Sequence, residues 1–240
     1  MLTSLCKNNI NQLKNISYPG RGIITGLSPN SKKYIQVYWI MGRSENSRNR
    51  IFIDEEGFVK TEAFDKEKLV DPSLIIYYPI KFYQNYHIVS NGDQTDTIYE
   101  ALRNKRSFET ALKSRTFEPD SPNFTPRISG IINMNKDNPA YQLSILKTFN
   151  NNPNYCLRQF YDYEKGLPGL GHCIHTYASD GDPLPSFSGE PFVVELYDSI
   201  EQTAAFYWET LNVENKVSLV VKSIDIESNI SHIFAMNKNQ

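Results

Sequence analysis

The chain has few of the features that identify common classes of protein. Its three cysteines, Cys6, Cys156 and Cys173, are odd in number and far apart, which argues against a disulfide framework and for a reducing compartment. No apolar run approaches the roughly 20 residues of a membrane-spanning helix. The first fifteen residues also lack the apolar segment of a signal peptide. We therefore expect a soluble cytoplasmic protein with no membrane partner.

The chain also has little net charge and none of the common nucleotide-binding motifs. The formal net charge is −2, so no overall field attracts nucleic acid, and a phosphorylated ligand would need a local cluster of arginines. The sequence has no Walker-type phosphate loop, no Rossmann glycine fingerprint and no nucleophile elbow. Any site must therefore be sought in less common polar patterns.

Short strand-like runs dominate the chain, and 13 Phe and 15 Tyr supply bulky core material. The run 74–78 is apolar throughout, which predicts a strand buried on both faces. We predict strands over 22–27, 34–41, 50–54, 74–82, 86–90, 127–134, 141–148, 155–161, 192–196, 217–226 and 232–236.

Few helices are expected. Apolar residues at three-to-four spacing predict one over 95–115, and a second over 199–211 begins with a capping-box pattern at Ser199. Residues 1–15 either fray or form a short helix. Without an internal linker, we predict one layered α+β domain over 1–240, with residues 1–16 peripheral.

The first polar stretch is basic and covers 18–22 and 42–50. Its arginines, beside glycines and small polar residues, suit bidentate capture of phosphate oxygens. The alternative is a solvated turn with exposed charges. The arginines are Arg21, Arg43, Arg48 and Arg50.

The second polar stretch, 90–97, follows a predicted strand and precedes a predicted helix. Asn91-Gly92 suits a tight turn because both residues tolerate positive φ, and Asp93 or Thr95 suits the N-cap of the helix. By itself this pattern fits a capped turn. Its position between strand and helix is also a place where α/β proteins bind ligands.

The charges of this stretch indicate which ligand groups it suits. Asp93 and Asp96 would repel a phosphate, although a helix N-terminus can bind anions. Carboxylates instead accept hydrogen bonds from ribose hydroxyls or amide N–H groups, and Asn91 can recognise a carboxamide.

The third polar stretch, 117–127, contains three prolines within eight residues, which restrict its backbone. The alternative to a site is a rigid connection between helix and strand. Its candidate site groups are Glu118, Asp120, Asn123 and Arg127.

Two later stretches carry weaker signals. If 171–177 is a strand, His172 and His175 point to opposite faces and cannot chelate one ion, so we predict no metal site. The segment 179–191 is rich in turn residues and suits a lid or rim.

Together and in this order, the three polar stretches resemble the archaeal-type IMP cyclohydrolase family. The resemblance covers the first half of the chain, and it marks 175–191 as a feature of bacterial members. The matching residues are Gly20-Arg21, Gly42-Arg43-Ser44 through Arg48, Val89-Ser90-Asn91-Gly92 with Thr95-Asp96-Thr97-Ile98, and Asn123 with Thr125-Pro126-Arg127-Ile128.

The resemblance implies a fold and a reaction. The fold is a four-layer α-β-β-α sandwich like that of N-terminal nucleophile hydrolases. The reaction is ring closure of 5-formamidoimidazole-4-carboxamide ribonucleotide to IMP with loss of water, which ends purine synthesis and is assigned to hydrolases of cyclic amidines. It requires no cofactor or metal, and its partner is a small purine nucleotide.

The resemblance also implies residue roles. Tyr77, or Tyr78 after a shift of one residue, and Glu118 would be the catalytic groups. The 5′-phosphate or a carbonyl would be held by Arg21, Arg43 and Arg48, with Arg50 as the alternative to Arg48. The ribose or carboxamide would be contacted by Asn91, Asp93, Thr95 and Asp96, with Asn123 and Arg127 nearby.

Two other functions remain open at this point. One is a purine monophosphate binder without catalysis, and the other is a different amide-processing enzyme that uses Cys6 or Cys173. A chain so rich in strands and aromatics is also expected to form a homo-oligomer.

Overall fold

The computed structural model describes residues 2–69, 72, 74–135 and 140–239. Two antiparallel sheets form the centre of this part of the chain. Sheet A has six strands in the order β11 (Phe192–Glu195), β10 (Leu170–His175), β1 (Gly22–Leu27), β2 (Lys33–Met41), β12 (Lys216–Asp225) and β13 (Ser231–Asn237).

Sheet B has seven strands that follow one another in both sequence and space. Their order is β3 (Ile51–Glu55), β4 (Phe58–Glu62), β5 (Ile80–Tyr83), β6 (Tyr86–Ser90), β7 (Arg127–Asn133), β8 (Tyr141–Phe149) and β9 (Asn152–Tyr163). Sequential antiparallel strands need only short turns, so sheet B is built mainly from hairpins.

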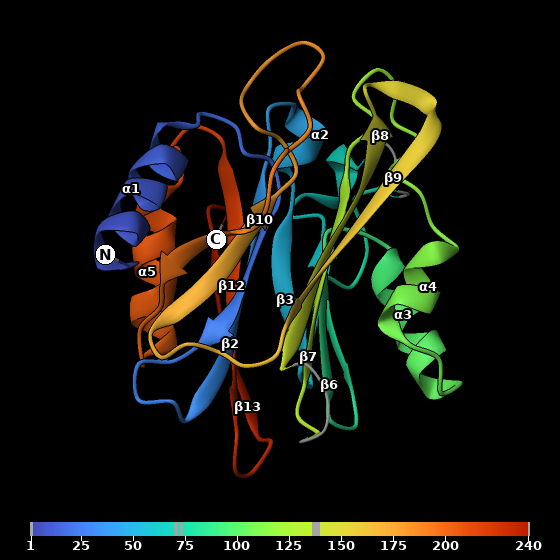
Figure 1. Cartoon of the computed structure of the whole chain (residues 1–240). Coiled ribbons are helices and arrows are strands. Elements are labelled where there is room, and N and C mark those ends of the chain that lie inside the picture. The colour runs from blue at the N-terminus through green and yellow to red at the C-terminus, as the bar shows by residue number, and fades with distance from the viewer. Residues whose placement is uncertain (1, 70–71, 73, 136–139, 240) are drawn as a thin grey trace.

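Helices cover the outer faces of the two sheets (Figure 1). The helices α1 (Leu2–Asn15) and α5 (Ile200–Thr210) lie against sheet A, and α3 (Gln94–Arg103) and α4 (Phe108–Lys113) lie against sheet B. The short α2 (Glu45–Arg48) and the 3-10 turn Lys66–Lys68 lie in connections. The order of layers is therefore helix, sheet, sheet, helix. None of the described helices is long and apolar enough to cross a membrane.

Alternating side chains divide the core into layers, as β2 illustrates. Tyr38 and Ile40 point between the sheets, where they pack with Ile23 of β1 and Val220 of β12. Trp39, on the other face of β2, packs under the outer helices. The two-residue period of a strand thus supplies two separate cores from one segment.

Most predicted strands are confirmed, but 74–82 is wrong for its first six residues, and β4 was not predicted. Only Ile80–Tyr83 is a strand there. Before it, Tyr77 donates its backbone N–H to Thr61 Oγ1 at 2.9 Å, and that hydroxyl donates to Ile75 O at 2.6 Å. Thr61 N also donates to Tyr77 O at 2.9 Å. Both the side chain and the backbone of this β4 residue therefore hold the segment without a regular strand ladder, which apolar character alone does not predict.

The predicted helix over 95–115 is two helices. The first helix ends at Arg103. Beyond it, Lys105 has φ +58°, and Asn104 Nδ2 donates to Glu100 O at 2.7 Å. Ser107 then caps α4 by accepting from Thr110 N at 3.2 Å. Both helices bury apolar residues on sheet B, so the apolar spacing continues across the break. The predicted α5 is confirmed, and its cap Ser199 accepts from Gln202 N at 3.1 Å.

The sequence does not decide whether residues 1–15 fray or form a helix. In the structure, residues 2–15 form α1, a helix of 14 residues. Cys6, Ile10 and Leu13 are buried on one side of it. Ile10 and Leu13 join the core between α1, α5 and sheet A. Burial of this face explains why a largely polar segment is helical.

Candidate functional site

A cluster of polar side chains, all buried except the partly buried Arg21, lies where several connections meet the inner faces of the sheets. Arg21 precedes β1, Arg50 precedes β3 and Tyr77 precedes β5. Tyr38 lies on β2, and Glu118 lies in the connection between α4 and β7. We call these five residues the buried cluster. They are far apart in sequence, so only the pairing of the strands brings them together.

The two arginines have nitrogens without a partner in the described part of the chain. Arg50 is fully buried, and although its Nε donates to Ser47 O at 2.8 Å, Nη1 and Nη2 make no hydrogen bond. Arg21 Nε is also unpaired. Burial, and then the charge of Arg21, lower the pKa of Arg50. Buried guanidinium groups are rarely left unpaired, so these nitrogens indicate a place for an oxygen-rich ligand.

Two tyrosine hydroxyls meet inside the cluster. Tyr38 Oη and Tyr77 Oη are 2.7 Å apart, and both side chains are buried. Burial, followed by the neighbouring Tyr77, raises the pKa of Tyr38. Tyr78 points elsewhere, since its hydroxyl donates to Glu55 Oε2 at 2.6 Å near the surface. The geometry therefore associates Tyr77, and not Tyr78, with the cluster.

Glu118 is the acid of the cluster and is 2% exposed. Burial raises its pKa to about 7, and this effect outweighs the opposing charges of Arg21 and Arg127. Its Oε1 lies 3.3 Å from the point that a Cβ on Gly92 would occupy, and Arg127 Nη1 lies 2.8 Å from the same point. A side chain at 92 would thus require the ends of the Arg127 and Glu118 side chains to move.

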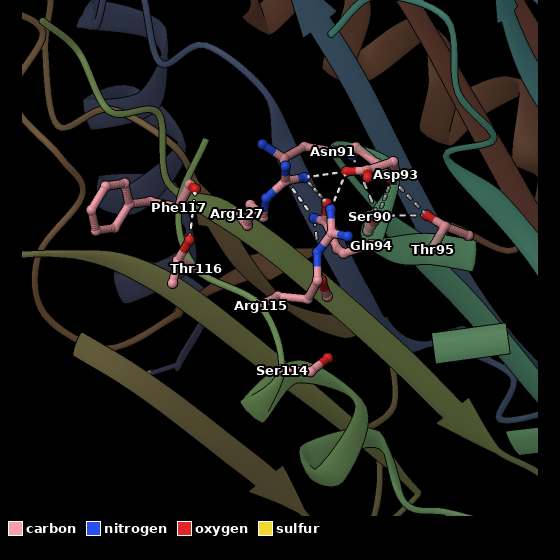
Figure 2. Close-up of polar contacts among 12 residues, drawn as sticks. Ser90, Asn91, Asp93, Gln94, Thr95, Ser114, Arg115, Thr116, Phe117 and Arg127 are labelled. Atoms are coloured by element: carbon pink, nitrogen blue, oxygen red, sulfur yellow. Dashed lines mark hydrogen bonds and ion pairs between the residues drawn. The ribbon is translucent and has the colours of Figure 1, made fainter. Parts of the chain in front are cut away.

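Polar contacts join the 90–97 stretch to Arg115 and Arg127, which flank the connection that carries Glu118 (Figure 2). Asn91 Oδ1 accepts from Ile128 N at 2.8 Å, and Asn91 Nδ2 donates to Pro126 O at 2.9 Å. Asp93 accepts from Arg127 at 2.7 Å and from Arg115 at 2.5 Å. The polar atoms of these side chains thus bond other residues of the chain. Their predicted contacts with ribose or carboxamide stay predictions.

The backbone of this stretch differs from the prediction. Neither Asn91 nor Gly92 has positive φ. Asp93 is the N-cap of α3 but makes no side-chain cap bond, because its carboxylate pairs with arginines. Thr95 lies inside the helix and bonds Ser90 Oγ at 2.5 Å. Side-chain bonds, rather than a left-handed turn, hold this connection.

Four other predicted site residues lie away from the buried cluster or use their polar atoms elsewhere. Arg43 pairs with Asp180 at 2.6 Å and covers the ring of Tyr18. Asn123 Oδ1 accepts from Leu184 N at 3.0 Å. Arg48 donates from Nε to Gly42 O at 2.9 Å, and the half-exposed Asp96 pairs with Lys81 at 2.5 Å. Of the alternatives Arg48 and Arg50, the structure places Arg50 in the cluster.

Two tyrosines at the cluster were not predicted. Tyr38 lies on an inward-facing position of β2. Tyr177 follows β10 and lies close enough to Arg21 to affect the pKa of that guanidinium group. In a chain with 15 tyrosines, each fits ordinary core packing, so no sequence signal separates them from the rest.

The histidines of β10 have different partners. His172 Nδ1 is 2.7 Å from Tyr141 Oη, whereas His175 Nδ1 is 2.9 Å from Tyr177 O. Across the described ranges, no group of three or more His, Cys, Asp or Glu residues is arranged to hold a metal ion.

Comparison with known protein families places the chain in one of them. The sequence model of a family described as IMP cyclohydrolase-like protein matches residues 18–229. This range contains the whole buried cluster and every loop that contributes to it. No curated protein matches the chain.

Proposed function

We propose that this chain, which belongs to the IMP cyclohydrolase-like protein family, closes the ring of 5-formamidoimidazole-4-carboxamide ribonucleotide to give IMP and water. The observation that carries the proposal is the buried cluster, where two arginines with unpaired nitrogens lie beside a tyrosine pair and a glutamate whose pKa is about 7. This set can bind carbonyl oxygens and move protons without a cofactor.

The reaction needs orientation and proton transfer. The carboxamide nitrogen attacks the formyl carbon, the formyl oxygen becomes a hydroxyl, and that hydroxyl leaves as water. Both reacting groups are on one imidazole ring, so holding them in the reactive rotamer supplies much of the rate. The carboxamide nitrogen loses one proton when it attacks, and the formamido nitrogen loses another when the hydroxyl leaves, so the departing oxygen gains two protons in all.

Glu118 is suited to both proton transfers. With a pKa of about 7 it is partly protonated at neutral pH, so it can accept a proton in one step and donate in the next. We propose that Glu118 accepts the proton of the attacking carboxamide nitrogen. The same proton is then available for the leaving hydroxyl.

The tyrosine pair and the arginines would act on oxygen atoms. Tyr77 would donate to the formyl oxygen as negative charge develops there, and Tyr38, 2.7 Å away, would relay the proton. The unpaired nitrogens of Arg21 and Arg50 would bind the carboxamide or formyl oxygen. The 5′-phosphate would then lie toward the more exposed Arg43.

The remaining predicted residues would build the walls of the site. Asn91, Asp93, Thr95 and Arg127 fix the connection that brings Gly92 against Glu118. Asn123 would hold the rim through Leu184.

A cysteine-based amide reaction has less support. Cys6 and Cys173 are buried, and burial raises the pKa of both thiols, so neither forms the thiolate that a nucleophile requires.

Incubation of the purified protein with the formamido ribonucleotide tests the proposal. We expect IMP to form faster than in a blank without protein. Folded protein that binds IMP by calorimetry but forms none from this substrate would indicate a binder instead. Folded protein that neither binds nor reacts would reject the proposed ligand class.

A further inference from the structure

The connection between β10 and β11 has no role in the reaction proposed above. It is the orange loop that extends beyond the ends of the sheets in Figure 1. Several contacts hold it in place: Arg43 with Asp180, Asn123 with Leu184 N, and Lys147 Nζ with Phe187 O at 2.6 Å. We call residues 177–189 the strap.

Tyr177, at the start of the strap, is packed into the interior and is 1% exposed. Its ring stacks on Tyr18, with 5.9 Å between the ring centroids. Gly20 has φ +74°, and a Cβ there would come within 2.6 Å of the Tyr177 ring. A larger residue at 20 would therefore displace Tyr177, so the backbone that leads into Arg21 is shaped to admit this ring.

The hydroxyl of Tyr177 begins a chain of hydrogen bonds toward Glu118. Tyr177 Oη is 2.5 Å from Thr125 Oγ1, and Thr125 Oγ1 also bonds Asp120 Oδ2. An ionised carboxylate only accepts, so Thr125 donates to Asp120, and Tyr177 donates to Thr125. The direction of every bond in the chain is thereby fixed.

The same threonine holds the backbone of Glu118. Thr125 N donates to Asp120 Oδ1 at 2.6 Å, and Glu118 N donates to Thr125 O at 2.9 Å. The loop 118–125 is thus closed on itself, and two contacts tie it to the strap: Asn123 with Leu184 N, and the Tyr177 hydroxyl with Thr125, next to the backbone bond that holds Glu118.

We infer that Tyr177 positions Glu118 for the proposed reaction, acting through Thr125 and Asp120. The inference rests on the proposed function. Tyr177 bridges the segment that leads into Arg21 and the loop that carries Glu118, so it sets the distance between the acid and the arginine. Loss of its hydroxyl would loosen the loop while the ring keeps its packing.

The substitution Tyr177→Phe tests this, with Tyr161→Phe as a matched control. Tyr161 donates to Gly189 O at 3.0 Å, so it holds the far end of the same strap but does not reach the 118–125 loop. For Tyr177→Phe we expect kcat to fall about tenfold or more, with KM within about twofold, because small misplacement of a catalytic group is costly. The control keeps wild-type kcat.

A pH profile separates positioning from a general structural effect. In a looser loop water reaches Glu118, the effect of burial weakens, and the pKa of the carboxyl group falls. The kcat/KM profile of Tyr177→Phe should therefore shift to lower pH, while that of Tyr161→Phe is unchanged. Unchanged kcat and an unshifted profile in folded Tyr177→Phe would overturn the inference.

A titration of the free protein distinguishes failure of the inference from failure of the proposed function. Infrared difference spectra against Glu118→Gln report the Glu118 carboxyl without any substrate. If the wild-type protein forms no IMP, the proposed function fails. The inference still predicts a lower Glu118 pKa in Tyr177→Phe than in Tyr161→Phe, and equal values would reject it.

Discussion

Two groups of buried polar residues lie between the sheets, and they differ in composition and in origin. The buried cluster joins two arginines, a glutamate and two tyrosines. The second group, which we call the lysine row, has Thr25, Gln36 and Lys222 on the neighbouring strands β1, β2 and β12, with His87 of β6 nearby. In both groups the described structure leaves polar atoms unpaired.

The lysine row contains one cation and no buried acid. His87 Nε2 is 2.9 Å from Asn229 Oδ1, which only accepts, so Nδ1 is an acceptor. Gln36 Oε1 is also an acceptor, and Lys222 Nζ is a donor. Thr25 Oγ1 is unpaired as well in the described part of the chain. The row thus contains hydrogen-bond donors and acceptors, but it lacks the paired opposite charges of the buried cluster.

The buried cluster differs because its members come mostly from connections rather than from strands. Arg21, Arg50, Tyr77 and Glu118 precede strands or lie in a loop, where the backbone can adjust around a ligand. Opposite charges and hydroxyl groups also converge there. Unpaired buried atoms alone thus do not mark a site, whereas unpaired atoms of mixed charge on separate loops do.

The largest expected effect belongs to Glu118. Glu118→Gln keeps the shape but cannot exchange a proton, so kcat should fall by about 10²-fold or more. Steady-state kinetics with the formamido ribonucleotide measure this. A variant with near wild-type kcat would remove Glu118 from the proposed chemistry.

The same substitution has a pH-dependent effect on stability. Because burial raises the pKa of Glu118 from 4.5 to about 7, its contribution to stability is full below pH 4.5 and is lost as the pH rises through 7. Relative to the wild type, Glu118→Gln should thus gain on the order of 3 kcal/mol across this window. Urea denaturation at several pH values measures the difference, and a gain toward lower pH would contradict it.

Neighbouring tyrosines provide the next test. Tyr77→Phe removes the hydroxyl that faces Tyr38, and kcat should fall about tenfold to hundredfold. Tyr78→Phe removes a hydroxyl bonded to Glu55 near the surface, and it should keep wild-type kinetics. The reverse result would place Tyr78 at the reacting end.

A smaller effect is expected for the arginines. Arg50→Met removes unpaired donors of the cluster and should weaken IMP binding about tenfold in calorimetry. Arg48→Met removes a contact to Gly42 O and should leave IMP affinity unchanged. Equal losses in both variants would contradict the assignment of Arg50 over Arg48.

The smallest effect on activity is expected for Lys222→Met, with kcat and KM within about twofold of wild type. Burial lowers the pKa of Lys222 from 10.5 to about 7, so the unfolded chain holds the extra proton between these values. Wild-type stability then rises with pH over this window. The variant should be more stable than wild type at pH 7, and the gain should vanish near pH 10 in urea denaturation. Loss of catalysis would place the lysine row in the site.

The sequence predicted the strands well because their signals are local. The strands 22–27 and 86–90 form with the predicted bounds. The run 74–79 is not a strand because Thr61 binds it with its side chain as well as its backbone, which no local pattern reveals.

The site was predictable only in part. Arg21 and Glu118 were candidates from the polar stretches, and the family resemblance gave Glu118 its role and added Tyr77. The spacing could not separate Arg48 from Arg50. Tyr38 and Tyr177 could not be found, because their contacts with Tyr77 and Thr125 depend on strand pairing and loop closure across 39 and 52 positions of sequence.

A crystal structure with IMP bound tests the central claim most directly. We expect the purine base against Glu118, with its oxygen within hydrogen-bond distance of Arg50 or Tyr77 and the phosphate toward Arg43. IMP in the surface pocket lined by Tyr86, Arg106 and Gln142, with the buried cluster unchanged, would contradict it.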